Sequence, residues 1–173
     1  MLAYTICFCR SADRVLLLHR RRPPNAGRWN GVGGKLAPGE TPAACIRREV
    51  LEETGIDIGT TGTLHFAGIV TWTLGADPTM PSSGMYAFVA DLGPRFPIWV
   101  GDRDTPEGLL RWHPLAHVSD PANHALVSNL LHFAPPMLAG EPAVEYRCAY
   151  IGEQLAEVTR HPLLIGVAVP SAT

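Results

Sequence analysis

Short apolar and polar blocks follow one another along the first forty positions. Two apolar runs, 3–9 and 14–19, flank the polar turn 10–13 and predict adjoining strands, with a hairpin as one arrangement. Residues 20–40 then bring consecutive arginines, a pair of prolines and five glycines. This composition predicts a loop, or short strand pieces inside a loop.

A helix is predicted directly after this loop. Thr41 is a suitable N-cap, and Pro42 fits the first helical position, where its missing N–H costs nothing. The helix should end near Thr54, because Gly55 readily adopts the left-handed conformation that follows a helix. Apolar positions on one arc of this helix can pack against a sheet.

The rest of the chain predicts more strands and one further helix. The expected elements are strands at about 64–73 and 85–91, a loop at 75–84, an irregular stretch at 92–108, a strand at 109–113, a helix near 122–133 and a hairpin at about 144–160. Strands interleaved with two helices favour one layered α/β or α+β domain. We expect it to cover residues 1–162, followed by a tail at 163–173.

Composition narrows the class of protein. The 173 residues are 46% hydrophobic, which suits a single domain with a core. A formal net charge of −2 argues against a nucleic-acid coat or a membrane-surface protein. No apolar run approaches the roughly 18 residues of a membrane span, and residues 1–9 are too short for a secretory signal. We therefore expect a soluble, cytoplasmic protein.

The four cysteines favour neither a metal site nor a disulfide framework. Cys7, Cys9, Cys45 and Cys148 include no CxxC pair and no regular spacing. We expect them to be buried free thiols, as in a protein of a reducing compartment.

Two oppositely charged segments lie within the near-neutral chain. Residues 20–35 hold five of the 14 cations and no acid, whereas residues 40–57 hold five of the 16 acids and only two arginines. A cationic, glycine-rich loop therefore precedes an acidic helix. This order suits a site where backbone and cations approach a small anion.

Three glutamates crowd one face of the predicted helix. Glu49, Glu52 and Glu53 stand at i, i+3 and i+4, where like charges repel each other. A divalent cation with hard oxygen ligands would neutralise them, and a solvated acidic helix face is the alternative. Arg48 can reach Glu52 one turn on and would orient a carboxylate rather than react. Gly33 leaves its backbone open to a ligand.

The full spacing of this segment resembles the Nudix box of hydrolases that act on nucleoside diphosphate-linked compounds. The matching residues are Gly34, Glu40 after five residues, Arg48-Glu49-Val50 after seven, Glu52-Glu53 after one, and Gly55-Ile56 after one more. At typical residue usage, such a match has a chance of roughly one in 10⁹ per starting position. The box spans residues 34–56 and contains no departure from the pattern.

The resemblance implies both a fold and a chemistry. It implies an α/β/α sandwich with a mixed sheet, in which the box forms a loop, a helix and a loop. It also implies bound Mg²⁺, or Mn²⁺, and attack of water on a diphosphate phosphorus. Glu49 and Glu53 would be the principal metal ligands, Glu52 a ligand or the proton acceptor, and Gly33 a carbonyl ligand. Which glutamate is the general base stays open.

The resemblance extends beyond the box to the MutT- and MutX-like branch, whose members hydrolyse 8-oxo-dGTP to the monophosphate and pyrophosphate. Tyr4-Thr5 and Trp29-Asn30 have the same separation as the matching pairs of the animal enzymes of this branch, without a gap, whereas Pro23-Pro24 departs from their more flexible loop. Glu107 matches an additional metal ligand outside the box. The expected substrate-binding residues are Thr5, Arg20, Trp29, Asn30, Gly34, Lys35 and Asn123.

Several of these residues also suit purely structural roles. The alternatives are a strand position for Thr5, packing in the loop for Trp29, a turn for Asn30, a helix cap for Asn123 and a surface acid for Glu107, with Asp102 and Asp104 as competing ligands. An asparagine side chain offers both a donor and an acceptor, so Asn30 and Asn123 would also suit the edge of a purine.

The leading hypothesis is a Mg²⁺-dependent nucleoside triphosphate pyrophosphohydrolase that prefers oxidised purines and so cleans the nucleotide pool for DNA repair. One alternative is hydrolysis of another substrate, such as an ordinary dNTP, a nucleotide sugar or ADP-ribose. The other is a non-catalytic ligand sensor of the same fold. The expected partner is a small nucleotide, with no nucleic-acid polymer and no membrane. The chain would be a monomer or a homodimer.

Overall fold

The computed structural model describes residues 2–73 and 83–163, and these form nine strands and four helical segments. The strands are β1 (Tyr4–Ser11), β2 (Arg14–Arg20), β3 (Trp29–Asn30), β4 (Thr63–Thr73), β5 (Ser83–Asp91), β6 (Arg103–Thr105), β7 (Gly108–Pro114), β8 (Val144–Ile151) and β9 (Gln154–Pro162). The helical segments are α1 (Pro42–Thr54), α2 (Ile58–Thr61), the 3₁₀ helix η1 (Leu115–Val118) and α3 (Leu130–Leu138).

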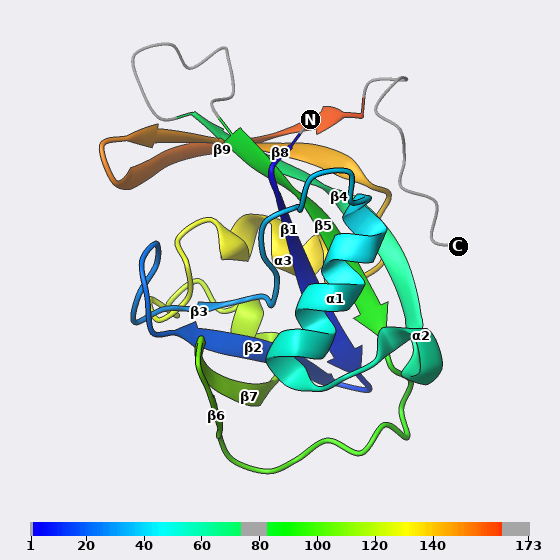
Figure 1. The fold of residues 1–173 in the computed structure, drawn as a ribbon. Coiled ribbons are helices and arrows are strands. Elements are labelled where there is room, and N and C mark those ends of the chain that lie inside the picture. Colours follow the sequence, from blue (N-terminus) through cyan, green and yellow to red (C-terminus); the bar gives the residue numbers. More distant parts are fainter. Residues whose placement is uncertain (1, 74–82, 164–173) are drawn as a thin grey trace.

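All of the described strands belong to one mixed sheet. Its order is β6-β7-β2-β1-β5-β4-β8-β9, with β3 added beside β2. β1 runs parallel to β5, and β4 runs parallel to β8, while the other neighbours are antiparallel (Figure 1). The predicted hairpins are confirmed as β1–β2 and β8–β9.

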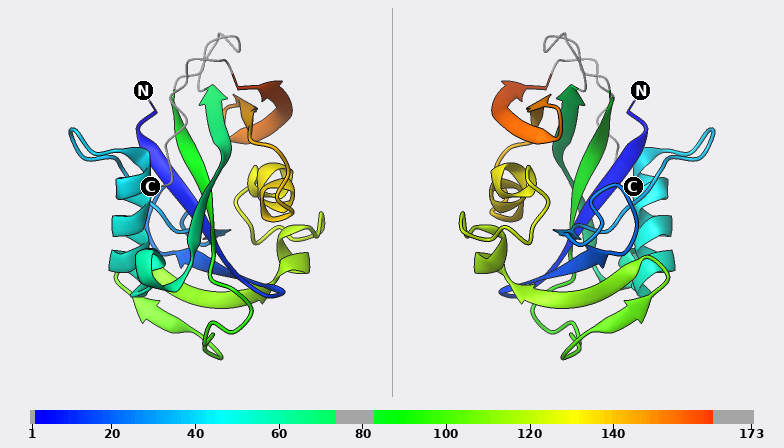
Figure 2. Two further views of the ribbon diagram at one scale, coloured as in Figure 1. Left: turned by 90° about the vertical axis from the view of Figure 1, so that its right-hand side faces the viewer. Right: turned by 90° about the vertical axis from the view of Figure 1, so that its left-hand side faces the viewer.

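Helices cover both faces of the sheet. Figure 2 shows α1 on one side of the strands and α3 on the other. Successive residues of β1 alternate between the two cores, since Cys7 and Cys9 pack in the core beneath α1, whereas Ile6 and Phe8 pack in the core beneath α3. The expected α/β/α sandwich is therefore confirmed.

Helix α1 begins and ends where the sequence predicts. The Thr41 hydroxyl accepts a hydrogen bond from the Ala44 N–H at 3.2 Å, and Pro42 opens the helix. Gly55 follows the last turn in the left-handed conformation, with φ of 76°, and its N–H donates to the Leu51 carbonyl. These local signals fix the register of the acidic face of the helix.

The predicted helix near 122–133 is wrong in position, because its first half is extended or turned. The Asn123 side chain accepts from the Ala125 N–H at 3.2 Å and closes a turn. The backbone of Trp29 then bonds the Ala125 carbonyl at 2.8 Å and the Val127 N–H at 3.0 Å. Pairing with β3 therefore replaces helical hydrogen bonds in this stretch.

The second helix instead forms as α3. Leu126, Leu130 and Phe133, whose spacing suggested one helix, are all buried in the same core, but Leu126 reaches it from the extended segment. Pro135 and Pro136 lie inside α3, although proline usually ends a helix.

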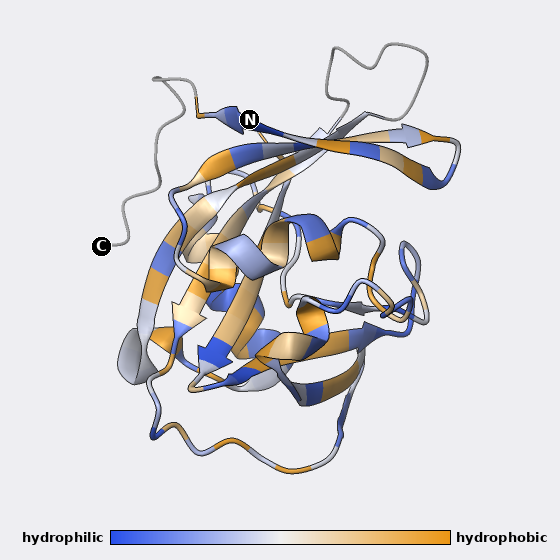
Figure 3. Ribbon diagram, turned by 180° about the vertical axis from the view of Figure 1, so that it is seen from behind, coloured by the Kyte–Doolittle hydropathy of each residue, from blue (hydrophilic) through white to orange (hydrophobic). Residues whose placement is uncertain are grey.

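The remaining predictions have mixed outcomes. The stretch 92–108 contains the unpredicted short strand β6, and α2 was also not predicted. The predicted loop 75–84 and tail 163–173 lie almost entirely outside the described residues. The four cysteines are buried and free, as expected. Figure 3 shows the alternation of hydrophilic and hydrophobic residues along β8 and β9, the pattern that predicted the hairpin at about 144–160. In the described part of the chain, no helix has the length and apolar character needed to cross a membrane.

Candidate active site

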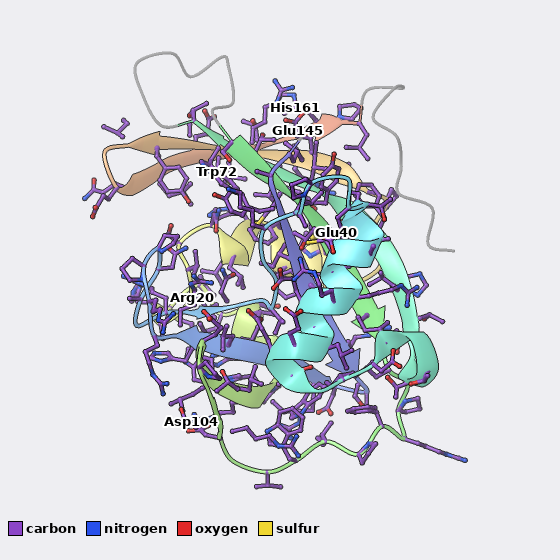
Figure 4. The ribbon with its side chains drawn as sticks, in the orientation of Figure 1. Arg20, Glu40, Trp72, Asp104, Glu145 and His161 are labelled. Carbon is purple, nitrogen blue, oxygen red and sulfur yellow. The ribbon has the colours of Figure 1, made fainter. Side chains whose placement is uncertain are left out.

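A pocket of about 420 Å³ lies between the box segment and the β6–β7 turn. Its lining residues are Arg20, Gly33, Gly34, Lys35, Glu49, Glu52, Glu53, Thr105, Pro106 and Glu107. Figure 4 labels Arg20 at the end of β2 and Glu40 just before α1. Segments far apart in the sequence thus place four carboxylates and two cations around one space.

Arg48 organises the carboxylates of the box. Its guanidinium donates to Glu40 at 2.9 Å, to Glu49 at 2.8 Å and to Glu52 at 3.2 Å. The hydrogen bonds to Arg48 lower the pKa of Glu40 to about 2, and Glu40 and Glu49 in turn raise the pKa of Arg48. Arg48 therefore stays a cation and orients carboxylates, the role predicted from its spacing.

Glu53 is the most perturbed carboxylate of the pocket. Burial raises its pKa to about 7, and the negative charges of Glu49 and Glu107 act in the same direction. A hydrogen bond from the Gly33 N–H to Glu53 Oε2, at 3.3 Å, acts in the opposite direction. The pocket thus concentrates negative charge that water does not fully solvate.

Two glycines allow the loop to approach these carboxylates. A Cβ on Gly34 would lie 2.4 Å from the carboxyl carbon of Glu49. Gly33 has φ of +153°, and a Cβ there would lie 2.3 Å from the Thr5 carbonyl oxygen. The first contact involves a flexible side-chain end, whereas the second involves backbone, so the two positions restrict substitution for different reasons.

The donor chemistry of the pocket fits a hard divalent cation. Carboxylate oxygens from Glu49, Glu53 and Glu107 line it, and these are ligands that Mg²⁺ and Mn²⁺ prefer. Among the described residues, no three His, Cys, Asp or Glu side chains lie close enough together to hold a metal ion without moving. Carboxylates that repel each other would move together around a cation, so the residues fit such an ion.

Three of the predicted substrate-binding residues line the pocket, and four do not. Those that line it are Arg20, Gly34 and Lys35. Thr5 is buried, with its hydroxyl 3.4 Å from Cys45 Sγ, and supports the glycine loop through its N–H bond to the Gly34 carbonyl. Asn30 belongs to β3, and its side chain accepts from the N–H of its neighbour Gly31 at 3.0 Å.

The other two side chains are also held by internal contacts. Trp29 is only 8% exposed and packs against the rings of His19 and His113, which favours the packing alternative. Asn123 donates to the His117 carbonyl at 3.0 Å, so it stabilises a turn instead of capping a helix. Neither residue is among those that line the pocket.

Glu107 differs from the nearby acids Asp102 and Asp104 in its contacts. Asp102 pairs with Arg111, and Asp104 pairs with Arg21, while Glu107 lines the pocket. Sequence reasoning missed Thr105 and Pro106 as lining residues. Their position directly before Glu107 is the only signal that the sequence gives for them.

The structure is an α/β/α sandwich, in which a mixed sheet lies between two helical layers. An acidic pocket between a loop and a helix lies at one side of the sheet. The family profile described as NUDIX domain matches residues 1–132. The chain therefore belongs to the Nudix family, as its box predicted.

Individual relatives agree with this assignment. The oxidized purine nucleoside triphosphate hydrolase of Mus musculus is 38% identical over 88 residues, which are 51% of this chain and 53% of that protein. The chain thus matches about half the length of this relative. The uncharacterized Nudix hydrolase YvcI of Bacillus subtilis is 30% identical over 152 residues, 86% of this chain and 87% of that protein. A MutT structure from Bacillus halodurans shares the fold, with a TM-score of 0.68 and 22% identity, and covers 92% of this chain and 97% of that one.

Alanine substitutions at the two glycines should have different effects. Gly34→Ala displaces the Glu49 carboxylate and weakens Mn²⁺ binding by about tenfold, with little change in stability. Gly33→Ala forces backbone apart and lowers the free energy of unfolding by about 1–3 kcal/mol. Mn²⁺ titration and urea unfolding of both variants test this. Equal destabilisation by the two substitutions would contradict it.

Glu53→Gln should stabilise the metal-free protein at high pH. The folded-state pKa of Glu53 is raised, so its contribution to stability falls as the pH rises from 4.5 through about 7. The variant should gain at most about 3 kcal/mol in free energy of unfolding at pH 8, and nothing near pH 4.5. Urea unfolding with a chelator present measures both. Glu52→Gln, at a side chain that is 59% exposed, is the matched control and should change little. A Glu53→Gln variant less stable than the wild type at pH 8 refutes the account.

Proposed function

We propose that this chain is a Mg²⁺-dependent hydrolase that cleaves a phosphoanhydride bond of nucleoside triphosphates. Its preferred substrates are oxidised purine nucleotides such as 8-oxo-dGTP, which it converts to the monophosphate and pyrophosphate. The observation that carries the proposal is the pocket itself, where Glu49, Glu53 and Glu107 face a common space beside Arg20 and Lys35. Membership of the Nudix family supports the same reaction class.

Some residues of the pocket would bind an anion, and others would bind a cation. Arg20 and Lys35 provide positive charge for phosphate oxygens, and Lys35 adds a flexible ammonium group. Glu49, Glu53 and Glu107 would hold Mg²⁺, which when bound would offset phosphate charge and acidify water. Glu52, the carboxylate that extends furthest into solvent, accepts the proton of the attacking water. Arg48 keeps Glu49 oriented throughout.

An aromatic surface beside the pocket suits a nucleobase. The backbone of Tyr4 pairs with that of Lys35, and the Tyr4 ring lies 6.3 Å from the ring of Trp72. Tyr4 is 39% exposed, so its ring is available for stacking. The preference for oxidised purines is further supported by the name of the mouse relative.

Hydrolysis of a substrate panel, followed by the nucleoside monophosphate that each compound releases, tests this function. With Mg²⁺, hydrolysis of 8-oxo-dGTP should exceed that of dGTP, CTP and ADP-ribose by at least about fivefold in kcat/KM, because about 1–3 kcal/mol separates matched from unmatched polar contacts. A chelator should abolish it. Equal rates on all four compounds would contradict the base preference, and no hydrolysis of any of them would favour a ligand sensor.

A further inference from the structure

Arg21 ties the end of β2 to the turn that carries Glu107. Its backbone N–H donates to the Glu107 carbonyl at 3.0 Å. Its guanidinium donates to the Thr105 carbonyl at 3.0 Å and to the Asp104 carboxylate at 2.5 Å. Arg21 thus forms hydrogen bonds with three residues of the segment 104–107.

Few other contacts are available to orient this segment. β6 has three residues and forms the edge of the sheet, so only β7 pairs with it there. Within the turn, the Thr105 hydroxyl bonds both the carbonyl and the N–H of Gly108, at 2.9 and 3.2 Å. These bonds close the turn. The pairing of β7 with β2 fixes the turn as far as Gly108, and Arg21 extends this attachment to residues 104–107. Figures 1 and 4 show β6 and Asp104 near the end of β2 that carries Arg20.

We propose that Arg21 is a positioning residue that holds Glu107 towards the carboxylates of α1, so that both elements can bind the same divalent cations. Glu107 lines the pocket from the side of the β6–β7 turn, whereas Glu49 and Glu53 line it from the helix. The inference rests on the proposed metal-dependent hydrolysis, which it deepens by naming a residue outside the pocket that assembles the site.

The chemistry of Arg21 suits orientation better than stability. Its side chain is 50% exposed and that of Asp104 is 71% exposed, and ion pairs so open to solvent contribute little to overall stability. A guanidinium is planar and has several fixed donors, so it can bond a carbonyl and a carboxylate at once, whereas a lysine ammonium is a point charge. Loss of Arg21 should therefore affect the site and spare the fold.

Mn²⁺ binding followed by electron paramagnetic resonance tests the coupling between Arg21 and Glu107. The proteins compared are the wild type, Arg21→Ala, Glu107→Gln and the double variant, with Arg22→Ala as the control that removes the same charge from the neighbouring exposed residue. Arg21→Ala should weaken Mn²⁺ binding about three- to tenfold. In the Glu107→Gln background the same substitution should change affinity less than about twofold, because the two residues act as one unit. Arg22→Ala should behave like the wild type.

Two further measurements separate positioning from a structural role or a general charge effect. The thermal midpoint of Arg21→Ala should stay within about 2 °C of the wild type. Arg21→Lys keeps the charge and should recover less than half of the lost Mn²⁺ affinity. Equal Mn²⁺ affinities of Arg21→Ala and Arg22→Ala, or equal losses with and without Glu107, would overturn the proposal. If Arg21 and Glu107 are coupled in Mn²⁺ binding but the wild type hydrolyses no nucleotide, the proposed function is wrong and the positioning role of Arg21 stands.

Discussion

Repulsion between carboxylates that share a poorly solvated pocket is the constraint on which the site depends. The like charges of Glu49, Glu53 and Glu107 repel each other, and burial makes the charge of Glu53 costly. The protein meets this cost with fixed donors, chiefly the guanidinium of Arg48 and the N–H of Gly33. The remaining negative charge is available for a divalent cation. Under the proposed function, a bound divalent cation would offset this repulsion and stabilise the site.

The fold supplies the rigid parts that this arrangement needs. Capping by Thr41 and Gly55 fixes where α1 begins and ends, and its apolar side packs on the sheet through Ile46 and Val50. The acidic side is consequently held towards the glycine loop. The second wall comes from the β6–β7 turn, more than fifty residues later in the chain. Without the pairing of β7 with β2, Glu107 would have no fixed relation to the helix.

The sequence predicts features that depend on contacts between nearby residues better than features that depend on contacts between distant residues. The bounds of α1 and the gathering of the box glutamates depend on caps and helical spacing, which are local, and both appear in the structure. The segment before α3 depends on pairing with Trp29, almost a hundred residues earlier, so its periodicity was misleading. Asn123 could not be assigned a partner although His117 is only six residues away, because the irregular turn that joins them has no periodic pattern in the sequence.

Anomalous X-ray scattering from crystals that contain Mn²⁺ would locate the ion relative to individual carboxylates. The account predicts Mn²⁺ inside the pocket, with oxygen ligands from Glu49 or Glu53 on α1 and from Glu107 on the β6–β7 turn, at about 2.2 Å. Mn²⁺ bound by the helix alone would contradict the shared site. A pocket without Mn²⁺ at millimolar concentration would contradict the whole account.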